Sequence, residues 1–184
     1  MKLLVLDPDF GKSALLMDNK KRAFNHLIVI QKMLDIFEKQ KSNTFASVPN
    51  YKLWRDYPNA MKVYFNALLQ VCKDIHKINT KYKYYEDFPE KINYPKFTDV
   101  TFVSHRAFLV SLDPELYIPK FGELDFNSNK LFWEYWFEKD GKKYLVAEDF
   151  NGIKRVDILL ENNPDFKSDY NLEEINYKYT KLRN

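Results

Sequence analysis

Between residues 23 and 37, apolar side chains recur at steps of four, three, four and three, which places them on one face of an α-helix. The members of this stripe are Ala23, Leu27, Ile30, Leu34 and Phe37. A second helical pattern follows over residues 58–77, where Pro58 suits the first turn of a helix but not its interior. We therefore expect a mainly α-helical fold built on two long helices, the first ending near residues 39–41.

The segments around these helices predict shorter elements. Residues 1–7 form either a short strand or an extended arm, which ends at an Asp-Pro-Asp turn. Ser13 is expected to cap a short helical turn, and residues 52–55 are expected to form another. Residues 78–100 are rich in aromatic side chains without a periodic pattern, which predicts an ordered loop.

A further helix is expected over residues 105–112, with Ser104 as its N-cap. The Asp113-Pro114 pair that follows either stops this helix or starts another short turn. Beyond residue 121 the pattern changes, because Asp140-Gly141 stands between two apolar-rich arms and predicts a β-hairpin. Residues 160–184 are polar and charged, and within them the segment NLEEINYKYTKL, residues 171–182, could form a last amphipathic helix.

These elements predict one compact, mainly α-helical domain. We assign residues 1–121 to the helical part, and residues 122–184 to a C-terminal appendage packed on the same domain. The appendage consists of the small β-hairpin and, in this interpretation, a short helix.

The charge is distributed unevenly, although the net charge is only +3. Residues 1–83 contain 15 Lys or Arg against 7 Asp or Glu, whereas residues 84–184 contain 14 against 19. A basic face supplied by the first half would attract a polyanion such as DNA. The alternative is a soluble chain whose charge is merely spread unevenly.

Candidate DNA-binding residues lie in three places. They are the cluster Lys20, Lys21 and Arg22, then Arg55 beside Trp54, and finally His105 with Arg106. A cluster of cations at a helix start opposes the helix dipole, which favours a role in binding phosphate. The structural alternatives are a solvated helix start, a surface salt bridge and an ordinary helix cap.

Several classes of function are not indicated. Four glycines leave no phosphate-binding glycine loop, and the three histidines and Cys72 show no metal-ligand spacing, so we expect no cofactor and no metal. No apolar run reaches the length of a membrane span, so no membrane association is expected. The single cysteine suits a reducing intracellular compartment, whether cytoplasmic, nuclear or viral.

Three blocks of the chain, read in order, resemble the pyrimidine-dimer DNA glycosylase family. They are PDFxKSAxxxDNKK, KLWRDYPNAMKVY and SHRAFLVSLDPELY, within residues 7–120. The family's usual blocks are PDFxxSAxxLDxKRLxKQxxE, HPAVxMWxGYxxAL and SHxSNLLxKDPxxY. The residues that match the family pattern are Asp18, Asn19, Lys20, Lys21, Trp54, Arg55, Ser104, His105, Asp113, Pro114 and Tyr117.

The resemblance implies a compact helical DNA-repair domain that flips a base out of the duplex and cleaves its glycosidic bond. The nucleophile of the phage members is the N-terminal α-amine, which here would belong to Met1, and a glutamate in the first long helix assists it. In this chain that glutamate position falls on Ile28, and no acid occurs between Asn19 and Leu34. Lys2 is also too large for Met1 to be trimmed easily.

Our leading hypothesis is therefore a DNA-binding protein on a pyrimidine-dimer glycosylase scaffold whose base-excision activity is lost or weakened. One alternative is an active DNA glycosylase and AP lyase that uses the Met1 amine with an acid from elsewhere, such as Asp18. Another is a structural or assembly protein that binds protein partners through residues 122–184.

Overall fold

The computed structural model describes residues 2–17, 20–38, 48–124, 132–149, 154–161 and 170–184. For residues 136–139, 142–145 and 154–161 we describe the backbone only. The helices are α1 (Phe10–Leu16), α2 (Lys20–Glu38), α3 (Pro49–Trp54), α4 (Pro58–Asp74), α5 (Asp99–Leu112), α6 (Pro114–Phe121) and α7 (Leu172–Asn176), followed by the 3-10 turn η1 (Tyr177–Thr180). The strands are β1 (Phe132–Lys139), β2 (Lys142–Asp149) and β3 (Lys154–Glu161).

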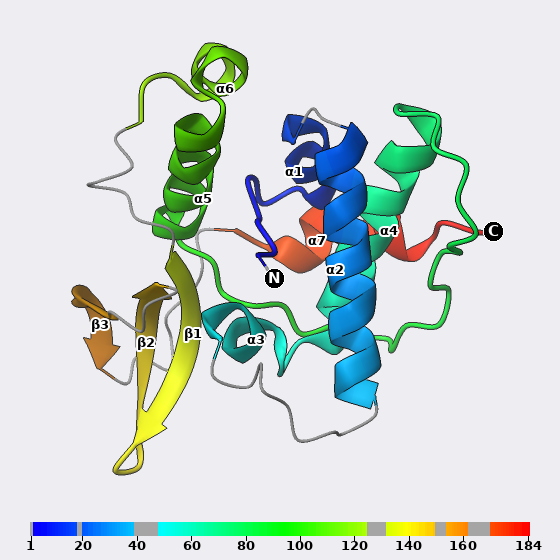
Figure 1. The fold of residues 1–184 in the computed structure, drawn as a ribbon. Helices are drawn as coiled ribbons and strands as arrows, with labels where there is room; N and C mark the ends of the chain where they lie inside the picture. Colours follow the sequence, from blue (N-terminus) through cyan, green and yellow to red (C-terminus); the bar gives the residue numbers. More distant parts are fainter. Residues whose placement is uncertain (1, 18–19, 39–47, 125–131, 150–153, 162–169) are drawn as a thin grey trace.

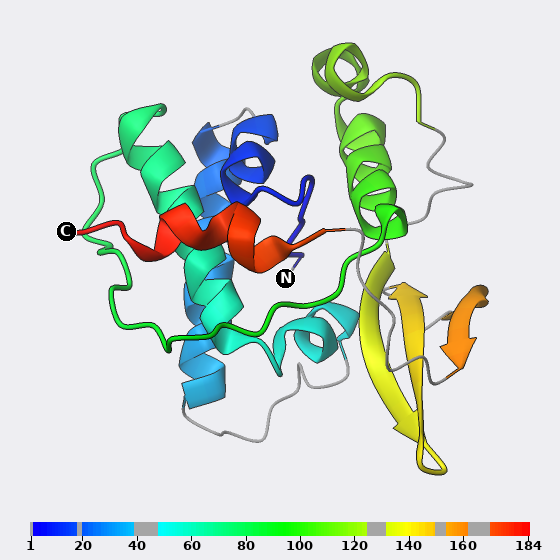
Figure 2. The same cartoon turned by 180° about the vertical axis from the view of Figure 1, so that it is seen from behind.

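The two long helices, α2 and α4, pack side by side at the centre of the molecule (Figures 1 and 2). The stripe expected on the first of them is confirmed, since Ala23, Leu27, Ile30 and Leu34 are all buried. Helix α4 begins at Pro58 as expected but ends at Asp74. Lys77, the expected last residue, lies beyond the helix with a positive φ of 52°.

The mainly α-helical fold with a C-terminal hairpin is confirmed. Strands β1 and β2 pair antiparallel, and Asp140 and Gly141 connect them with φ angles of 53° and 72°, as a tight hairpin turn requires. Strand β3, which the sequence analysis missed, pairs with β2 and makes a three-stranded sheet. The sheet stands beside α3 and α5 (Figure 1).

Residues 2–6 form an extended arm that is buried from Leu3 to Leu6, which settles the choice between arm and strand. The arm lies between α5 and the pair α1 and α2 (Figure 1). Side chains take the hydrogen bonds that a neighbouring strand would supply. Leu6 N–H donates to Ser13 Oγ at 2.9 Å, and the Leu4 carbonyl accepts from the Tyr64 hydroxyl at 2.7 Å. Ser13 therefore holds the arm, while the N-cap of α1 is Asp9.

The start of α5 differs from the expected one. Its N-cap is Thr98, and Ser104 lies inside the helix, where its hydroxyl donates to the Thr101 carbonyl at 3.0 Å. The cause is a carboxylate from another element: Glu134 of β1 accepts hydrogen bonds from Thr98 N–H at 3.0 Å and from the Thr101 hydroxyl at 2.6 Å.

At the other end of α5, the Asp113-Pro114 pair both stops this helix and starts another short one. Helix α5 stops at Leu112 and α6 starts at Pro114. The Asp113 side chain caps α6 by accepting from Leu116 N–H at 3.3 Å.

The last described segment crosses α4 on the face opposite α2 (Figure 2). Residues 171–182 were expected to hold a final helix, and they form α7 and the turn η1. Asn66 of α4 fixes this segment by donating to the Tyr179 carbonyl at 2.8 Å. Its buried side chains include Leu172, Asn176 and Tyr179.

Candidate nucleic-acid interface

Cations from three helices gather around one pair of aromatic rings. The rings of Tyr117 and Phe121 on α6 are parallel to within 3°, with centroids 5.7 Å apart. The Arg22 guanidinium lies 5.4 Å from the Tyr117 centroid, and the Lys120 ammonium 5.7 Å from it. The Arg106 guanidinium of α5 lies 5.7 Å from the Phe121 centroid. These distances are within the range of cation–π attraction.

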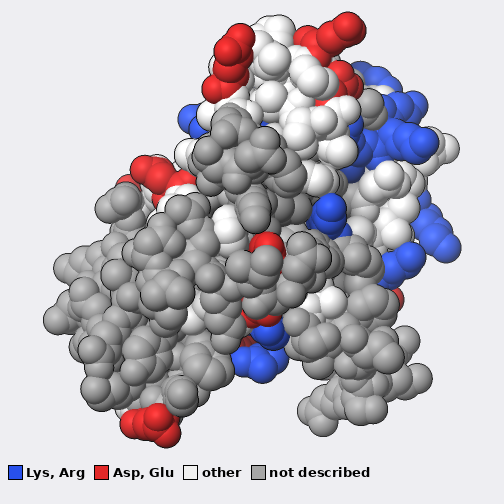
Figure 3. Space-filling model, turned by 60° about the vertical axis from the view of Figure 1, so that its left-hand side comes forward, with Lys and Arg blue, Asp and Glu red and all other residues white. Residues whose placement is uncertain are grey.

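We call this region the basic surface and define it by Lys20, Lys21, Arg22, Arg106 and Lys120. Lys20, Lys21 and Lys120 are exposed, and Arg22 and Arg106 are partly exposed. Figure 3 shows most of the visible Lys and Arg side chains on the right-hand side of the view, while Asp and Glu side chains lie at the top and also at the left, the centre and the bottom. Residues that are distant in sequence thus bring positive charge to one place.

The first turn of α2 contributes three of these cations and contains no acidic residue. Positive charge at a helix N-terminus adds to the positive end of the helix dipole, which destabilises the helix by a few tenths of a kcal/mol per charge. The same arrangement attracts an anion, because both the cationic side chains and the backbone N–H groups of a first helical turn carry positive charge. The cations at this end of α2 therefore favour the binding of a phosphate but reduce the stability of the helix.

Arg106 is held in a fixed orientation. Its Nε–H donates to the Leu6 carbonyl at 2.8 Å, and its Nη2 forms an ion pair of 3.7 Å with Asp7 Oδ2. The Arg106 side chain remains 31% exposed, so it can still present a guanidinium edge to an anion. The N-terminal arm therefore orients the only cation of the basic surface that comes from α5.

Tyr117 connects α6 to the first helices. It is fully buried, and its hydroxyl donates to the Met17 carbonyl, at the end of α1, at 2.7 Å. This bond brings Lys120 close to the start of α2. Asp113, Pro114 and Tyr117 thus build and orient α6 within the described structure.

The structure does not bring Arg55 to the basic surface. Arg55 follows α3, which lies near the C-terminal end of α2, whereas Lys20 lies at the other end (Figure 1). The length of α2, 19 residues, corresponds to about 28 Å. The Arg55 Nε also pairs with the neighbouring Asp56 carboxylate at 3.2 Å. Trp54, beside it, is fully buried against Phe10, Tyr64 and Phe97.

His105 is buried, where a phosphate cannot reach it. Its Nδ1 lies 2.9 Å from the Val5 backbone nitrogen and 3.0 Å from the Val5 carbonyl oxygen, and its Nε2 lies 2.9 Å from the Phe132 carbonyl oxygen. Burial lowers the pKa of His105 to about 4, against smaller opposite effects of its hydrogen bonds to Phe132 and Val5. His105 is therefore a neutral residue that ties α5 to the arm and to β1.

His26 is a residue of this region that the sequence analysis did not single out. It lies one turn after Arg22 on α2, and its Nδ1 makes a hydrogen bond of 2.9 Å to the Arg22 carbonyl. Burial lowers the pKa of His26 to about 4. The spacing of four residues is compatible with this bond, but the sequence alone does not show that the imidazole is buried.

Met1, Asp18 and Asn19 lie outside the described residues. The position of the expected glutamate can be described: Ile28 is partly buried on α2, and the acidic residues of this helix are Asp35 and Glu38, near its C-terminal end. Asp35 accepts a hydrogen bond from Gln31 Nε2 at 2.9 Å. Helix α2 therefore offers no carboxylate at the turn that contains Ile28.

Two features are absent from the described part of the chain. No group of three or more His, Cys, Asp or Glu side chains there is placed to hold a metal ion. No helix in this part of the chain has the length and apolarity needed to cross a bilayer.

Comparison of the chain with protein-family models, with curated proteins and with solved structures found no match in any of the three.

Proposed function

We propose that this protein binds DNA through the basic surface, on a scaffold that resembles the pyrimidine-dimer DNA glycosylases. The observation that carries the proposal is the convergence of Arg22, Arg106 and Lys120, from α2, α5 and α6, on the paired rings of Tyr117 and Phe121. Cations that come from separate elements and lie on one face can contact several phosphates of the same strand.

The physical basis is counterion release. Each Lys or Arg that neutralises a phosphate frees a condensed cation, so binding weakens as salt increases, by about 0.9 in the log–log slope per phosphate. If all five cations of the basic surface contacted phosphates, the slope would be about −4.5. Arginine adds paired hydrogen bonds to phosphate oxygens, which orient the strand as well as attract it.

We further propose that base excision is lost or weakened. An aliphatic side chain such as Ile28 can neither accept a proton nor stabilise a charge on a reacting sugar. We expect that borohydride will not trap the protein covalently on DNA containing an abasic site or a pyrimidine dimer. A trapped product that disappears after acetylation of the N-terminal amine would show instead that the protein is an active glycosylase or lyase.

DNA binding can be tested with two matched double variants. Lys20→Gln with Lys21→Gln removes two charges from the basic surface, whereas Lys81→Gln with Lys83→Gln removes two exposed charges from the loop between α4 and α5. Fluorescence anisotropy with a labelled duplex at several salt concentrations gives the affinity and the slope. We expect the first variant to bind more weakly and to reduce the slope by about 1.8, and the second to resemble the wild type.

Two outcomes would contradict the proposal. Binding by the wild-type protein that is absent, or independent of salt, would exclude a phosphate-contacting surface. Equal losses in the two double variants would show that positive charge acts only through the net charge of the protein, and not through the basic surface.

A further inference from the structure

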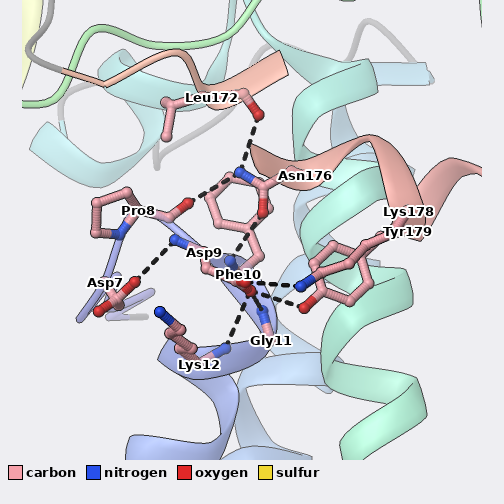
Figure 4. Close-up of polar contacts among 10 residues, drawn as sticks. All are labelled: Asp7, Pro8, Asp9, Phe10, Gly11, Lys12, Leu172, Asn176, Lys178 and Tyr179. Atoms are coloured by element: carbon pink, nitrogen blue, oxygen red, sulfur yellow. Dashed lines mark hydrogen bonds and ion pairs between the residues drawn. The ribbon is translucent and has the colours of Figure 1, made fainter. Parts of the chain in front are cut away.

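The turn between the N-terminal arm and α1 is held by a segment far away in the sequence (Figure 4). The Oδ1 of Asn176 accepts from Phe10 N–H at 2.8 Å, and its amide group donates to the carbonyls of Pro8 and Leu172 at 2.9 and 3.0 Å. Both N–H groups of this buried amide are therefore used. Asn176 fixes the backbone on each side of Asp9 and holds it against α7.

The Asp9 carboxylate is held by the same segment. It accepts from the Tyr179 hydroxyl and from Lys178 Nζ, each at 2.7 Å, while also capping α1 (Figure 4). Burial by itself raises the pKa of Asp9, but the bonds from Lys178, Tyr179 and the Lys12 N–H, with the charge of Lys178, lower it below its usual value. Asp9 is therefore an ionised anchor at neutral pH.

Gly11 fits this contact closely. A Cβ at this position would lie 1.8 Å from the Tyr179 hydroxyl oxygen, a distance at which the atoms overlap. Any larger residue would have to displace Tyr179 from the Asp9 carboxylate. The first turn of α1 is thus shaped to receive the C-terminal segment.

Asp7 connects this turn to the basic surface. Its Oδ1 accepts from Asp9 N–H at 2.9 Å, and its Oδ2 forms the ion pair with Arg106. The adjacent Leu6 carbonyl accepts the Arg106 Nε–H. Two of the protein contacts that orient the guanidinium therefore come from residues 6 and 7. The adjoining residues 8–10 are bonded to Asn176, Lys178 and Tyr179.

We propose that residues 172–180 are part of the DNA-binding site, with Asn176, Lys178 and Tyr179 acting as positioning residues for Arg106. Their effect passes through the turn at residues 8–10 and the Asp7 carboxylate. This inference rests on the proposed function. It gives the C-terminal segment a defined role, because the basic surface has its full geometry only when this segment is docked.

Two variants of different severity test the proposal in the full-length protein. Tyr179→Phe removes one hydroxyl and keeps the ring, and Asn176→Ala removes all the bonds of the amide. The matched control is Asn184→Ala, because Asn184 lies four residues beyond this segment and bonds to Tyr84 and Glu86 instead of to the turn at residues 8–10. Anisotropy gives the affinity and the salt slope, at a temperature well below the melting temperature measured for each variant.

Positioning makes a specific prediction for double variants. We expect Asn176→Ala to weaken DNA binding about tenfold, which is the cost of losing one charge-assisted hydrogen bond between Arg106 and a phosphate. The same variant should reduce the salt slope by about 0.9, the contribution of one phosphate. Tyr179→Phe should change both in the same direction by less. In an Arg106→Ala background neither change should weaken binding further, whereas in a Lys20→Ala background both should keep their full effect.

The contrary outcomes are distinct. If Asn176→Ala and Tyr179→Phe lower the melting temperature without changing the DNA affinity or the salt slope, residues 172–180 only stabilise the fold. If they weaken binding equally in the Arg106→Ala background, they do not act through Arg106. Either result overturns the inference while leaving the proposed function in place, whereas failure of the wild-type protein to bind DNA overturns both.

Discussion

His105 shows how one buried side chain makes stability depend on pH. The folded protein holds its imidazole neutral between Val5 and Phe132, and burial lowers its pKa from 6.5 to about 4. The unfolded chain therefore binds a proton at this residue that the folded protein cannot accept between about pH 4 and 6.5. The free energy of unfolding must fall as the pH decreases through this range, and it is fully regained above it.

We expect a loss of roughly 3 kcal/mol from His105 between pH 7 and pH 4, with a contribution of similar size from His26. Urea unfolding at a series of pH values measures it. His105→Gln should remove about half of the dependence while lowering the free energy of unfolding at pH 7. An unfolding free energy in the wild type that is constant between pH 4.5 and 6.5 would show that these imidazoles are not buried.

Helix α5 illustrates what the sequence can predict about an element and what it cannot. Its apolar core and its end before Asp113-Pro114 follow local rules, and both were expected. Local rules predict Ser104 as the N-cap and a start at residue 105, because a serine before an apolar run is a common N-cap, although the helix begins at Asp99. The missing information is Glu134, a residue of β1 that no local pattern connects with Thr98.

Glu134 should therefore be important for the stability of α5. It is 1% exposed and accepts hydrogen bonds from Thr98 N–H, from the Thr98 hydroxyl at 2.6 Å and from Thr101. Glu134→Gln turns an amide N–H₂ toward these donors, and we expect a loss of about 2 kcal/mol in the free energy of unfolding. Denaturant unfolding measures it, with Glu123→Gln, at an exposed residue after α6, as the control.

Hydrogen exchange would locate that effect. The amides of the first turn of α5 should exchange faster in Glu134→Gln, while those in the middle of α4 change only with the global stability. Unchanged protection at the start of α5 would show that Thr98 caps this helix without help from β1.

At the scale of the whole molecule, local patterns were sufficient for α2, α4 and the hairpin, because each pattern is complete within a few turns of chain. They missed β3, whose pairing is decided by the edge of β2. They also could not show that His105 is buried or that Arg55 lies at the far end of α2 from Lys20. Those facts depend on which distant segments become neighbours, and local patterns in the sequence do not show that.

The contact between Asn176 and Phe10, separated by 166 positions, also bears on how the protein is made. The turn at residues 8–10 leaves the ribosome long before its partner segment exists, so it must wait in an unfinished state. Because closing a loop of this size is entropically costly, the final step should be slow compared with the pairing of α2 and α4. The guanidinium of Arg106 would then take its place among the last groups in the protein to do so, after most of the interior has already formed.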